Sequence, residues 1–336
     1  MKALVTGATG FIGGALARRL HGAGWQVTGL GRNTTALAEL ESAGIATRRC
    51  DLADQAAAID VCREQEVVFH SAAHASDWGS PNDFVLNNVV ATRNIIAGCQ
   101  QHAVRRLVHV STPSLYFHFR ERLNVREDDP LPPPMNDYAR TKRMAEDEVN
   151  RACREGLPSV TIRPSAVFGP GDRILLPRLL DRLERRVLPI IGDGGAIVDL
   201  TYVENVVDAL ILCADARPTA IGKVYNITNG EPVRIWDLVR RICKRLDLAE
   251  PSFRVPYRVA DAGAALIEGA WRVTQRAGEP PVTRYSVSRI GLSSSLDISA
   301  ARAELGYEPR VPLQTAIDCT LEEWQRSRKV GGAART

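Results

Sequence analysis

Tyr138 and Lys142 have side chains suited to proton transfer, and their spacing would bring them together. They lie four residues apart in a segment of helical character, so we expect them on one face, one turn apart. A free tyrosine has a pKa of about 10 and is a poor acid–base catalyst at neutral pH. A nearby ammonium favours the phenolate and lowers that pKa. The pair also occurs by chance on surface helices, so it needs a second feature to support a catalytic role.

A glycine-rich loop near the N-terminus supplies that second feature. The apolar run 1–5 leads directly into Thr6-Gly7-Ala8-Thr9-Gly10-Phe11-Ile12-Gly13. A buried strand that runs through glycines into a helix leaves unpaired N–H groups at the helix start, where a pyrophosphate fits. A strand before the loop, a helix after it and a second strand at 26–30 predict a dinucleotide site rather than a plain glycine turn. The residues expected against the dinucleotide are Gly7, Gly10, Phe11, Ile12 and Gly13.

The end of the second strand bears on the choice of cofactor. A carboxylate at this place would bind the free 2′-hydroxyl of NAD, whereas an arginine suits the 2′-phosphate of NADP. The chain has Gly31-Arg32-Asn33 and no carboxylate there. Arg32 therefore favours NADP over NAD, with an exposed loop arginine as the alternative. The positive nicotinamide ring would add to Lys142 in lowering the pKa of Tyr138.

A third hydroxyl is expected to hold the reacting oxygen. The strand 106–110 ends in Ser111-Thr112-Pro113-Ser114, at the edge of the sheet where ligands bind. Such hydroxyls can also be simple turn formers. We expect Thr112 to be the partner of Tyr138, with Ser111 or Ser114 as alternatives.

Strands alternate with helices through the first half of the chain. This order predicts an α/β fold with a Rossmann-type doubly wound parallel sheet covered on both faces. Helices are expected near 35–43, 55–63, 83–102 and 136–154, and further strands at 45–49, 67–69, 106–110 and 159–163.

Beyond Pro164, glycine and proline separate shorter elements. We expect residues 1–165 to form the dinucleotide-binding domain, with a return of the chain to it around 196–229, and 166–330 to form mainly a smaller mixed α/β substrate domain. The apolar segment 259–273 could cover a lipophilic substrate or contact a membrane surface, although packing in the second domain is the simpler interpretation. Residues 331–336 are expected to be a disordered tail.

Composition excludes several classes of protein. Among 336 residues the net charge is only +4, and basic residues are scattered among acidic ones, so no nucleic-acid partner is indicated. The seven widely spaced cysteines contain no Cys-x-x-Cys, which predicts reduced thiols in a cytoplasmic protein and no metal site. No stretch approaches the roughly 20 apolar residues of a membrane span. Because the glycine loop begins so early, we expect no secretory signal.

The chain resembles the extended short-chain dehydrogenase/reductases over nearly its whole length. Within them it is most similar to the 3β-hydroxysteroid dehydrogenase group, which includes sterol-4α-carboxylate 3-dehydrogenases and bacterial 2-alkyl-3-oxoalkanoate reductases. The resemblance is carried by the glycine loop, the Tyr138/Lys142 pair and the segments 50–52, 68–73, 88–92, 111–114, 163–172, 198–206 and 225–232.

The resemblance implies roles for the matched positions. Asp51 and Leu52 would border the adenine, Ala72 and Ala73 the ribose and phosphates, and Lys142 the nicotinamide ribose. Thr112 falls at the family's catalytic serine or threonine. The resemblance further implies that Pro164, Ser165 and Ala166 lie by the nicotinamide, and we expect His74, Trp78 and Ser114 to face the substrate. Where family members that prefer NAD carry an aspartate, this chain has Gly31-Arg32.

These features lead to one hypothesis and two competitors. The hypothesis is an oxidoreductase that uses NADP or NAD to interconvert a ketone and a secondary alcohol on a small lipophilic substrate, a β-keto or β-hydroxy acid or a sterol-like ring. The competitors are a nucleotide-sugar epimerase or dehydratase that retains NAD, and a non-catalytic NADP-sensing regulator. The family likeness also implies a homodimer through the helices near 83–102 and 136–154.

Overall fold

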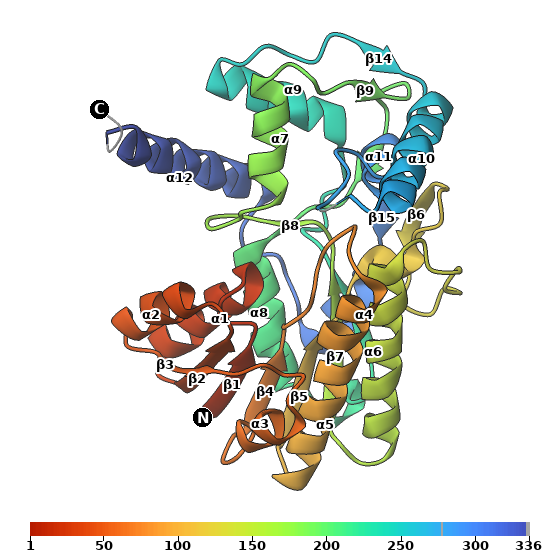
Figure 1. The fold of residues 1–336 in the computed structure, drawn as a ribbon. Coiled ribbons are helices and arrows are strands. Elements are labelled where there is room, and N and C mark those ends of the chain that lie inside the picture. The colour runs from red at the N-terminus through yellow and green to blue at the C-terminus, as the bar shows by residue number, and fades with distance from the viewer. Residues whose placement is uncertain (277, 334–336) are drawn as a thin grey trace.

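The first half of the chain is built on a seven-stranded parallel sheet. The computed structural model describes residues 1–276 and 278–333 (Figure 1). The strand order is β12-β7-β5-β4-β1-β2-β3, so the order reverses between β1 and β4. The strands are β1 (Lys2–Thr6), β2 (Gln26–Gly31), β3 (Ala46–Arg49), β4 (Val67–His70), β5 (Arg106–Val110), β7 (Ser159–Pro164) and β12 (Val224–Ile227). The predicted doubly wound parallel sheet is confirmed.

Helices cover both faces of this sheet (Figure 1). One face carries α1 (Phe11–Gly22), α2 (Thr34–Ser42) and α8 (Val203–Ala214), which pack on the strands through side chains such as Leu16, Leu40 and Val206. The other face carries α3 (Gln55–Asp60), α5 (Ala91–Gln101) and α6 (Asp137–Arg154), whose Ala58, Ile95 and Val149 share a second core cluster.

The helix expected near 83–102 has a more complex build. It consists of α4 (Pro81–Phe84), a π-helical segment (Val85–Val90) and α5, and it ends at Gln101. The π-helical segment carries Asn88, whose side-chain amide bonds both the Thr141 hydroxyl on α6 and the backbone of His74. This wide turn therefore fixes the loop after β4 to the helix that carries the candidate catalytic pair.

The second half of the chain forms a mixed α/β region. Its main sheet has the order β13-β10-β15-β6, in which only the β10–β13 pair is antiparallel. The strands outside the large sheet are β6 (Arg122–Val125), β8 (Val167–Phe168), β9 (Ile190–Ile191), β10 (Ile197–Val198), β11 (Thr201–Tyr202), β13 (Val233–Arg234), β14 (Arg254–Val255) and β15 (Ser294–Leu296). The helices are α7 (Leu175–Glu184), α9 (Ile235–Leu246), α10 (Tyr257–Thr274), α11 (Arg284–Gly291) and α12 (Leu313–Ala333), and short helical turns lie at 113–116, 218–220 and 301–305.

The chain passes between the two halves more than once. After β8 and β10 it returns to the large sheet, where α8 covers one face and β12 pairs with β7. In the other direction, β6 leaves the first half and pairs with β15. The second core is apolar and centres on Trp236, with Leu180 and Leu321 among its members.

Two expectations about the second half need correction. The helix α12 continues to Ala333, so residues 331–333 are helical rather than a disordered tail, and 334–336 lie outside the described residues. The segment 259–273 is a helix, but Ala264 is its one fully buried residue, and Val259, Leu266 and Val273 are 61%, 77% and 85% exposed. Packing in the second domain therefore accounts for only one side of the helix, where Tyr257, Ala260 and Ala264 join the second core.

Within the described part of the chain, none of the helices has both the length and the hydropathy that crossing a membrane requires.

Candidate active site

The glycine loop lies where the order of the large sheet reverses, between β1 and β4. Gly7 has φ of +69°, and a Cβ there would lie 2.8 Å from the backbone of Ala72 at the end of β4. A Cβ on Gly13 would lie 2.3 Å from the Gly7 carbonyl oxygen, and Gly10 N–H donates to that same oxygen at 2.8 Å. Only glycines allow this close approach, which leaves the start of α1 open to a pyrophosphate. The chain thus has a cradle that fits a dinucleotide.

Helix α6 holds Tyr138 and Lys142 at the carboxyl edge of the sheet. Asn136 caps the helix, because its side-chain oxygen accepts from Ala139 N–H at 2.8 Å, as the sequence predicts. Lys142 is 2% exposed, and its Nζ donates to the carbonyl oxygen of Val110, the last residue of β5, at 2.7 Å. The Lys142 side chain is therefore anchored beside Thr112.

The pKa shifts in this site differ from the predicted lowering at Tyr138. Burial raises the pKa of Tyr138 to about 12, and the hydrogen bond with Thr112 opposes this. Burial also lowers the pKa of Lys142 to about 8, with Glu146 opposing. The Lys142 ammonium donates to the end of β5 and has no hydrogen bond to the phenol. In the chain alone, the raised pKa keeps the Tyr138 phenol neutral, so it could donate a proton.

A relay of hydroxyls runs from the catalytic pair toward the second half of the chain. The Thr112 hydroxyl donates to Ser114 Oγ at 3.1 Å, and Ser114 Oγ lies 2.7 Å from the hydroxyl of Tyr285 on α11. Thr112 also caps the turn at 113–116 by accepting from Ser114 N–H at 3.2 Å. Ser111 is buried and its hydroxyl has no partner among the described residues. Thr112 and Ser114 thus lie beside Tyr138, and both line the same cavity.

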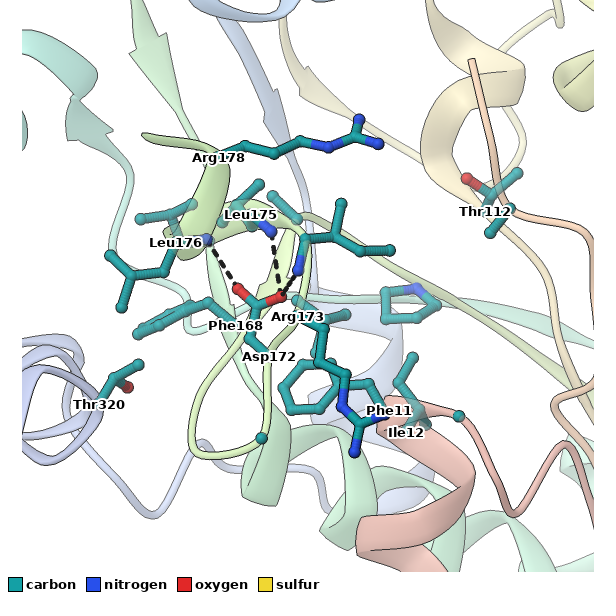
Figure 2. Close-up of a pocket in the computed structure, with 18 of the residues that line it drawn as sticks. Phe11, Ile12, Thr112, Phe168, Asp172, Arg173, Leu175, Leu176, Arg178 and Thr320 are labelled. Carbon is teal, nitrogen blue, oxygen red and sulfur yellow. Dashed lines mark hydrogen bonds between the residues drawn. The ribbon is translucent and has the colours of Figure 1, made fainter. Parts of the chain in front are cut away.

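This cavity has a volume of about 1300 Å³ and joins the two halves of the molecule. The glycine loop, Tyr138, Lys142 and Pro164 line one part of it. The part from the second half has a large apolar surface, with Phe168, Leu176, Leu188, Trp236, Val239 and Ile242 among its lining residues. Charged side chains line it too, among them Asp172, Arg178, Arg182 and Arg289. Figure 2 shows Phe11 and Ile12 of the glycine loop opposite Phe168, with Thr112 on a third side. A dinucleotide and an apolar substrate could therefore lie end to end.

Asp172 shapes the wall between these two parts. Its carboxylate accepts from the backbone N–H groups of Ile174, Leu175 and Leu176 at 2.8, 3.0 and 2.9 Å (Figure 2). This caps the start of α7, which would otherwise have unpaired donors. The cap fixes the turn from Gly169 to Arg173 across from the glycine loop.

The remaining expected site residues divide into two groups. Ala73 and Ala166 line the cavity, and Ala166 has a positive φ of 36°. Ala72 instead packs against Gly7, and the Ser165 hydroxyl donates to the Asp199 carbonyl oxygen at 3.3 Å, so neither lines it. Asp51 and Leu52 lie beyond β3, outside the lining; Asp51 is 3.9 Å from Arg32, and the Leu52 carbonyl oxygen accepts from Asn94.

His74 and Trp78 do not face this cavity, which corrects our expectation for both. The loop after β4 alternates, so Ala73, Ala75 and Asp77 line the cavity and their neighbours point away. The His74 ring packs on Phe84 at 4.6 Å between centroids, and the Trp78 ring lies under the Arg272 guanidinium at 5.3 Å.

A smaller cavity of about 650 Å³ lies beside the glycine loop at the end of β2. Thr9, Gly10, Arg32, Asn33, Thr34 and Arg49 line it. Arg49 was missed by sequence reasoning, although it ends β3, the neighbour of β2, at the same edge of the sheet. Two arginines at this place form a cationic site.

Comparison with known proteins agrees with this geometry. The model of the NAD dependent epimerase/dehydratase family matches residues 3–228. The chain belongs to this family. It is an extended short-chain dehydrogenase/reductase, an NAD(P)-dependent enzyme, as the sequence predicts.

Relatives in the family include ketone reductases and sterol dehydrogenases. The chain is 36% identical to the 2-alkyl-3-oxoalkanoate reductase of Stenotrophomonas maltophilia, over 99% of this chain and 100% of that protein. It is 34% identical to the 3beta-hydroxysteroid-dehydrogenase/decarboxylase isoform 1 of Arabidopsis thaliana, over 82% of this chain and 65% of that protein. Among solved structures, MoeE5 in complex with UDP-glucose and NAD is similar with a TM-score of 0.77 and 27% identity, over 97% of this chain and 99% of that one.

Proposed function

We propose that this enzyme uses NADPH to reduce the ketone of a 2-alkyl-3-oxo acid to a secondary alcohol, and catalyses the reverse oxidation. The observation that carries the proposal is the convergence of Tyr138, Lys142 and Thr112 on a cavity with a dinucleotide cradle at one end and an apolar chamber at the other. The similarity to 2-alkyl-3-oxoalkanoate reductase over the whole chain supports the substrate class.

Each side chain has a defined part in the reduction. When bound, the cofactor supplies the hydride. Tyr138 donates its proton to the carbonyl oxygen, and its raised pKa keeps that proton in place until charge develops there. The Thr112 hydroxyl holds the oxygen. Ser114 is hydrogen-bonded both to Thr112 and to Tyr285, which fixes the orientation of Thr112. Lys142, buried and bound to the end of β5, is positioned to hold the nicotinamide ribose.

The proposal of NADPH rests on the small cationic cavity. Arg32 and Arg49 line it together with the Asn33 and Thr34 backbone at the start of α2. Guanidinium groups bind a phosphate dianion strongly, whereas the 2′-hydroxyl of NADH offers them no charge. We expect a KM for NADPH at least tenfold below that for NADH. A lower KM for NADH would remove this part of the proposal.

A screen of cofactor oxidation tests the reaction. NADPH and NADH are each offered with a 2-alkyl-3-oxo acid, a 3-ketosteroid and a UDP-sugar, and the loss of NADPH absorbance is followed. The proposal predicts turnover with the oxo acid. Absence of turnover with the oxo acid and the ketosteroid would contradict it.

A nucleotide-sugar epimerase is the second candidate, because the fold is shared with MoeE5 bound to UDP-glucose and NAD. Such an enzyme retains its NAD through the catalytic cycle. The apolar side chains Leu176, Leu188, Trp236 and Val239 favour a lipophilic substrate. Arg178 and Arg182 line the same cavity and could bind a pyrophosphate, but they already donate to Glu279 and to the Pro281 carbonyl oxygen. Purification with tightly bound NAD and interconversion of UDP-sugars would favour the epimerase.

We further propose contact of α10 with a membrane surface. Val259, Leu266 and Val273 are exposed and recur every seven residues along the helix, so they share one face. Arg258 and Arg272 are exposed at the two ends of that helix, an arrangement that suits anionic headgroups. Co-sedimentation with phosphatidylglycerol vesicles, but not with phosphatidylcholine vesicles, is expected. Equal recovery in both supernatants would contradict the contact.

A cytoplasmic homodimer completes the proposal. The seven cysteines are all free, which supports a reducing compartment. Leu86 is 43% exposed on the π-helical segment beside α6, on the surface where the family likeness implies the dimer. Light scattering should give twice the mass of the chain, and cell fractionation should recover the protein from the cytoplasm. A monomeric mass at micromolar protein concentration would contradict the dimer. Recovery of the protein from another cell fraction would contradict the cytoplasmic location.

A further inference from the structure

Arg289 is a half-buried cation with unused hydrogen-bond donors in the substrate end of the cavity. It lies on α11 and lines the large cavity. Its Nη1 donates to Ser294 Oγ at 2.8 Å, and its guanidinium lies 3.9 Å from the centroid of the Phe117 ring. Within residues 1–276 and 278–333, no carboxylate lies within 4.0 Å of it. A guanidinium has five N–H donors, so most remain free for a ligand.

The position of Arg289 follows from the hydroxyl relay. Tyr285 ends that relay at Ser114, and Arg289 comes four residues after Tyr285, on the same face of α11 one turn further along. Burial raises the pKa of the Tyr285 phenol, and the charge of the Arg289 guanidinium opposes this. Arg289 therefore lies beyond Tyr285, at the end of the relay that begins at Thr112, and lines the same cavity as Thr112 and Tyr138.

Two carboxyl groups face Arg289 without occupying its donors. Asp199 accepts from Leu296 N–H at 2.6 Å, and burial raises its pKa to about 6. Asp77 lines the cavity, and burial raises its pKa as well. Neither carboxylate is within ion-pair distance of Arg289 in the described residues, so its guanidinium keeps donors that a ligand anion can use. Such an anion would compensate its charge.

We propose that Arg289 binds the carboxylate of the substrate, and that this enzyme therefore selects 3-oxo and 3-hydroxy acids over neutral ketones and alcohols. This inference rests on the proposed function and names the group that defines its substrate class. In a 3-oxo acid one carbon separates the carboxylate from the ketone, so with the ketone at Thr112 the carboxylate would extend along the relay toward Tyr285 and Arg289. The planar guanidinium can bind both carboxylate oxygens at once.

The test compares a 2-alkyl-3-hydroxy acid with its methyl ester, which differ in charge and are both chemically stable. Initial rates of NADP⁺ reduction give kcat/KM for each. The wild type is expected to prefer the acid by about tenfold to a hundredfold. Arg289→Gln should lose that preference by weakening turnover of the acid, with the ester within about twofold of the wild type. Arg289→Lys keeps the positive charge but loses the planar pair of donors of the guanidinium. Its preference for the acid should therefore fall between those of the wild type and Arg289→Gln.

Arg284→Gln is the matched control on the same helix. Arg284 is outside the cavity lining and forms two hydrogen bonds with Asp261, at 2.8 and 2.9 Å, so the acid-to-ester preference should be unchanged. Thermal unfolding of each variant checks the fold. Should Arg289→Gln fail to fold, the wild-type preference and Arg289→Lys still decide the matter.

The outcomes separate the two proposals. Equal turnover of acid and ester by the wild type, or a preference that survives Arg289→Gln, overturns the carboxylate site and leaves the proposed reaction standing. No turnover of either compound overturns the proposed function and the inference with it.

Discussion

At the scale of single residues, the charged side chains of the site lie at separate places around the neutral Tyr138. Lys142 is buried and bound to the strand end, Tyr138 is kept neutral, and Arg289 lies at the far side of the hydroxyl relay. Arg32 and Arg49 stand apart in the small cavity near the glycine loop. Under the two proposals these cationic places bind different anions, a cofactor phosphate and a substrate carboxylate.

A double variant tests the place near the glycine loop. Replacing Arg32 and Arg49 with glutamine should raise the KM for NADPH about tenfold to a hundredfold, because charge-assisted hydrogen bonds to the phosphate are lost. The KM for NADH should stay within about twofold. Arg48→Gln is the control, since Arg48 pairs with Asp60 at 3.0 Å and does not line the small cavity. An unchanged KM for NADPH in the double variant would contradict the assignment.

At the scale of elements, β1 and α1 meet too closely for any side chain at Gly13. The Gly7 carbonyl oxygen and Ser71 Oγ lie 2.3 and 2.8 Å from the place of a Cβ. Ser71 also donates to the Thr6 carbonyl oxygen at 2.6 Å, which joins β4 to β1. The cradle is thus a property of the packing between three elements, and backbone atoms cannot move aside as a flexible side chain can.

Gly13→Ala should therefore disturb the cradle as a whole. We expect a loss of about 1–3 kcal/mol in the free energy of unfolding, from overpacking, and at least about tenfold weaker NADPH binding. Gly22→Ala, at the end of the same helix with open space around it, should keep the affinity and stabilise the helix by up to about 1 kcal/mol. Urea denaturation and a fluorescence titration measure both. Equal affinity in the two variants would contradict the packing argument.

At the scale of the whole molecule, distant segments meet at one edge of the large sheet. Two neutral histidines lie in the sheet below that edge: His70 and His109 are partners in the β4–β5 ladder and stack at 5.5 Å. His70 is held by the hydroxyls of Thr6 and Thr92, whereas both ring nitrogens of His109 lack partners among the described residues. Burial lowers the pKa of His70 to about 3 and that of His109 well below its ordinary value.

These shifts predict a pH-dependent stability that His109→Phe should reduce. Below a pH of about 6.5 the unfolded chain binds a proton at His109 that the folded chain does not, so acid destabilises the fold. The phenylalanine in the variant does not titrate. The free energy of unfolding of the variant, relative to that of the wild type, should therefore rise by up to about 1.4 kcal/mol for each pH unit of acidification. Urea denaturation across pH 7 to 5 measures the difference. A difference that is constant with pH would contradict it.

The sequence predicts best what local patterns determine. The strand 106–110 and the Asn136 cap were predicted as observed, and the helix beginning at Asp137 with them, because alternation, buried runs and capping act over a few residues. The glycine loop was predicted equally well, because its glycines all lie within residues 6–13 between a strand and a helix. These features contain Tyr138 and Lys142, and Thr112 follows two residues after the strand.

What the sequence missed depends on contacts between distant segments. Tyr285 reaches Ser114 across 171 positions, and no local pattern around it indicates a site. His74 and Trp78 look suited to a substrate, but the alternation of their loop turns them away and presents Ala75 and Asp77 instead. The pKa of Tyr138 could not be predicted either, because burial by the surrounding chain, not the charge of Lys142, dominates it.

The most direct test of the account is the rate of hydride transfer in a single turnover by Tyr138→Phe. With NADPH and a 2-alkyl-3-oxo acid, the variant should bind the cofactor within about twofold of the wild type and transfer hydride about 10²- to 10⁴-fold more slowly, since the proton donor is gone. Tyr285→Phe, which shortens the relay but keeps the donor, should slow transfer by less than about tenfold. Hydride transfer by Tyr138→Phe at the wild-type rate would contradict the account.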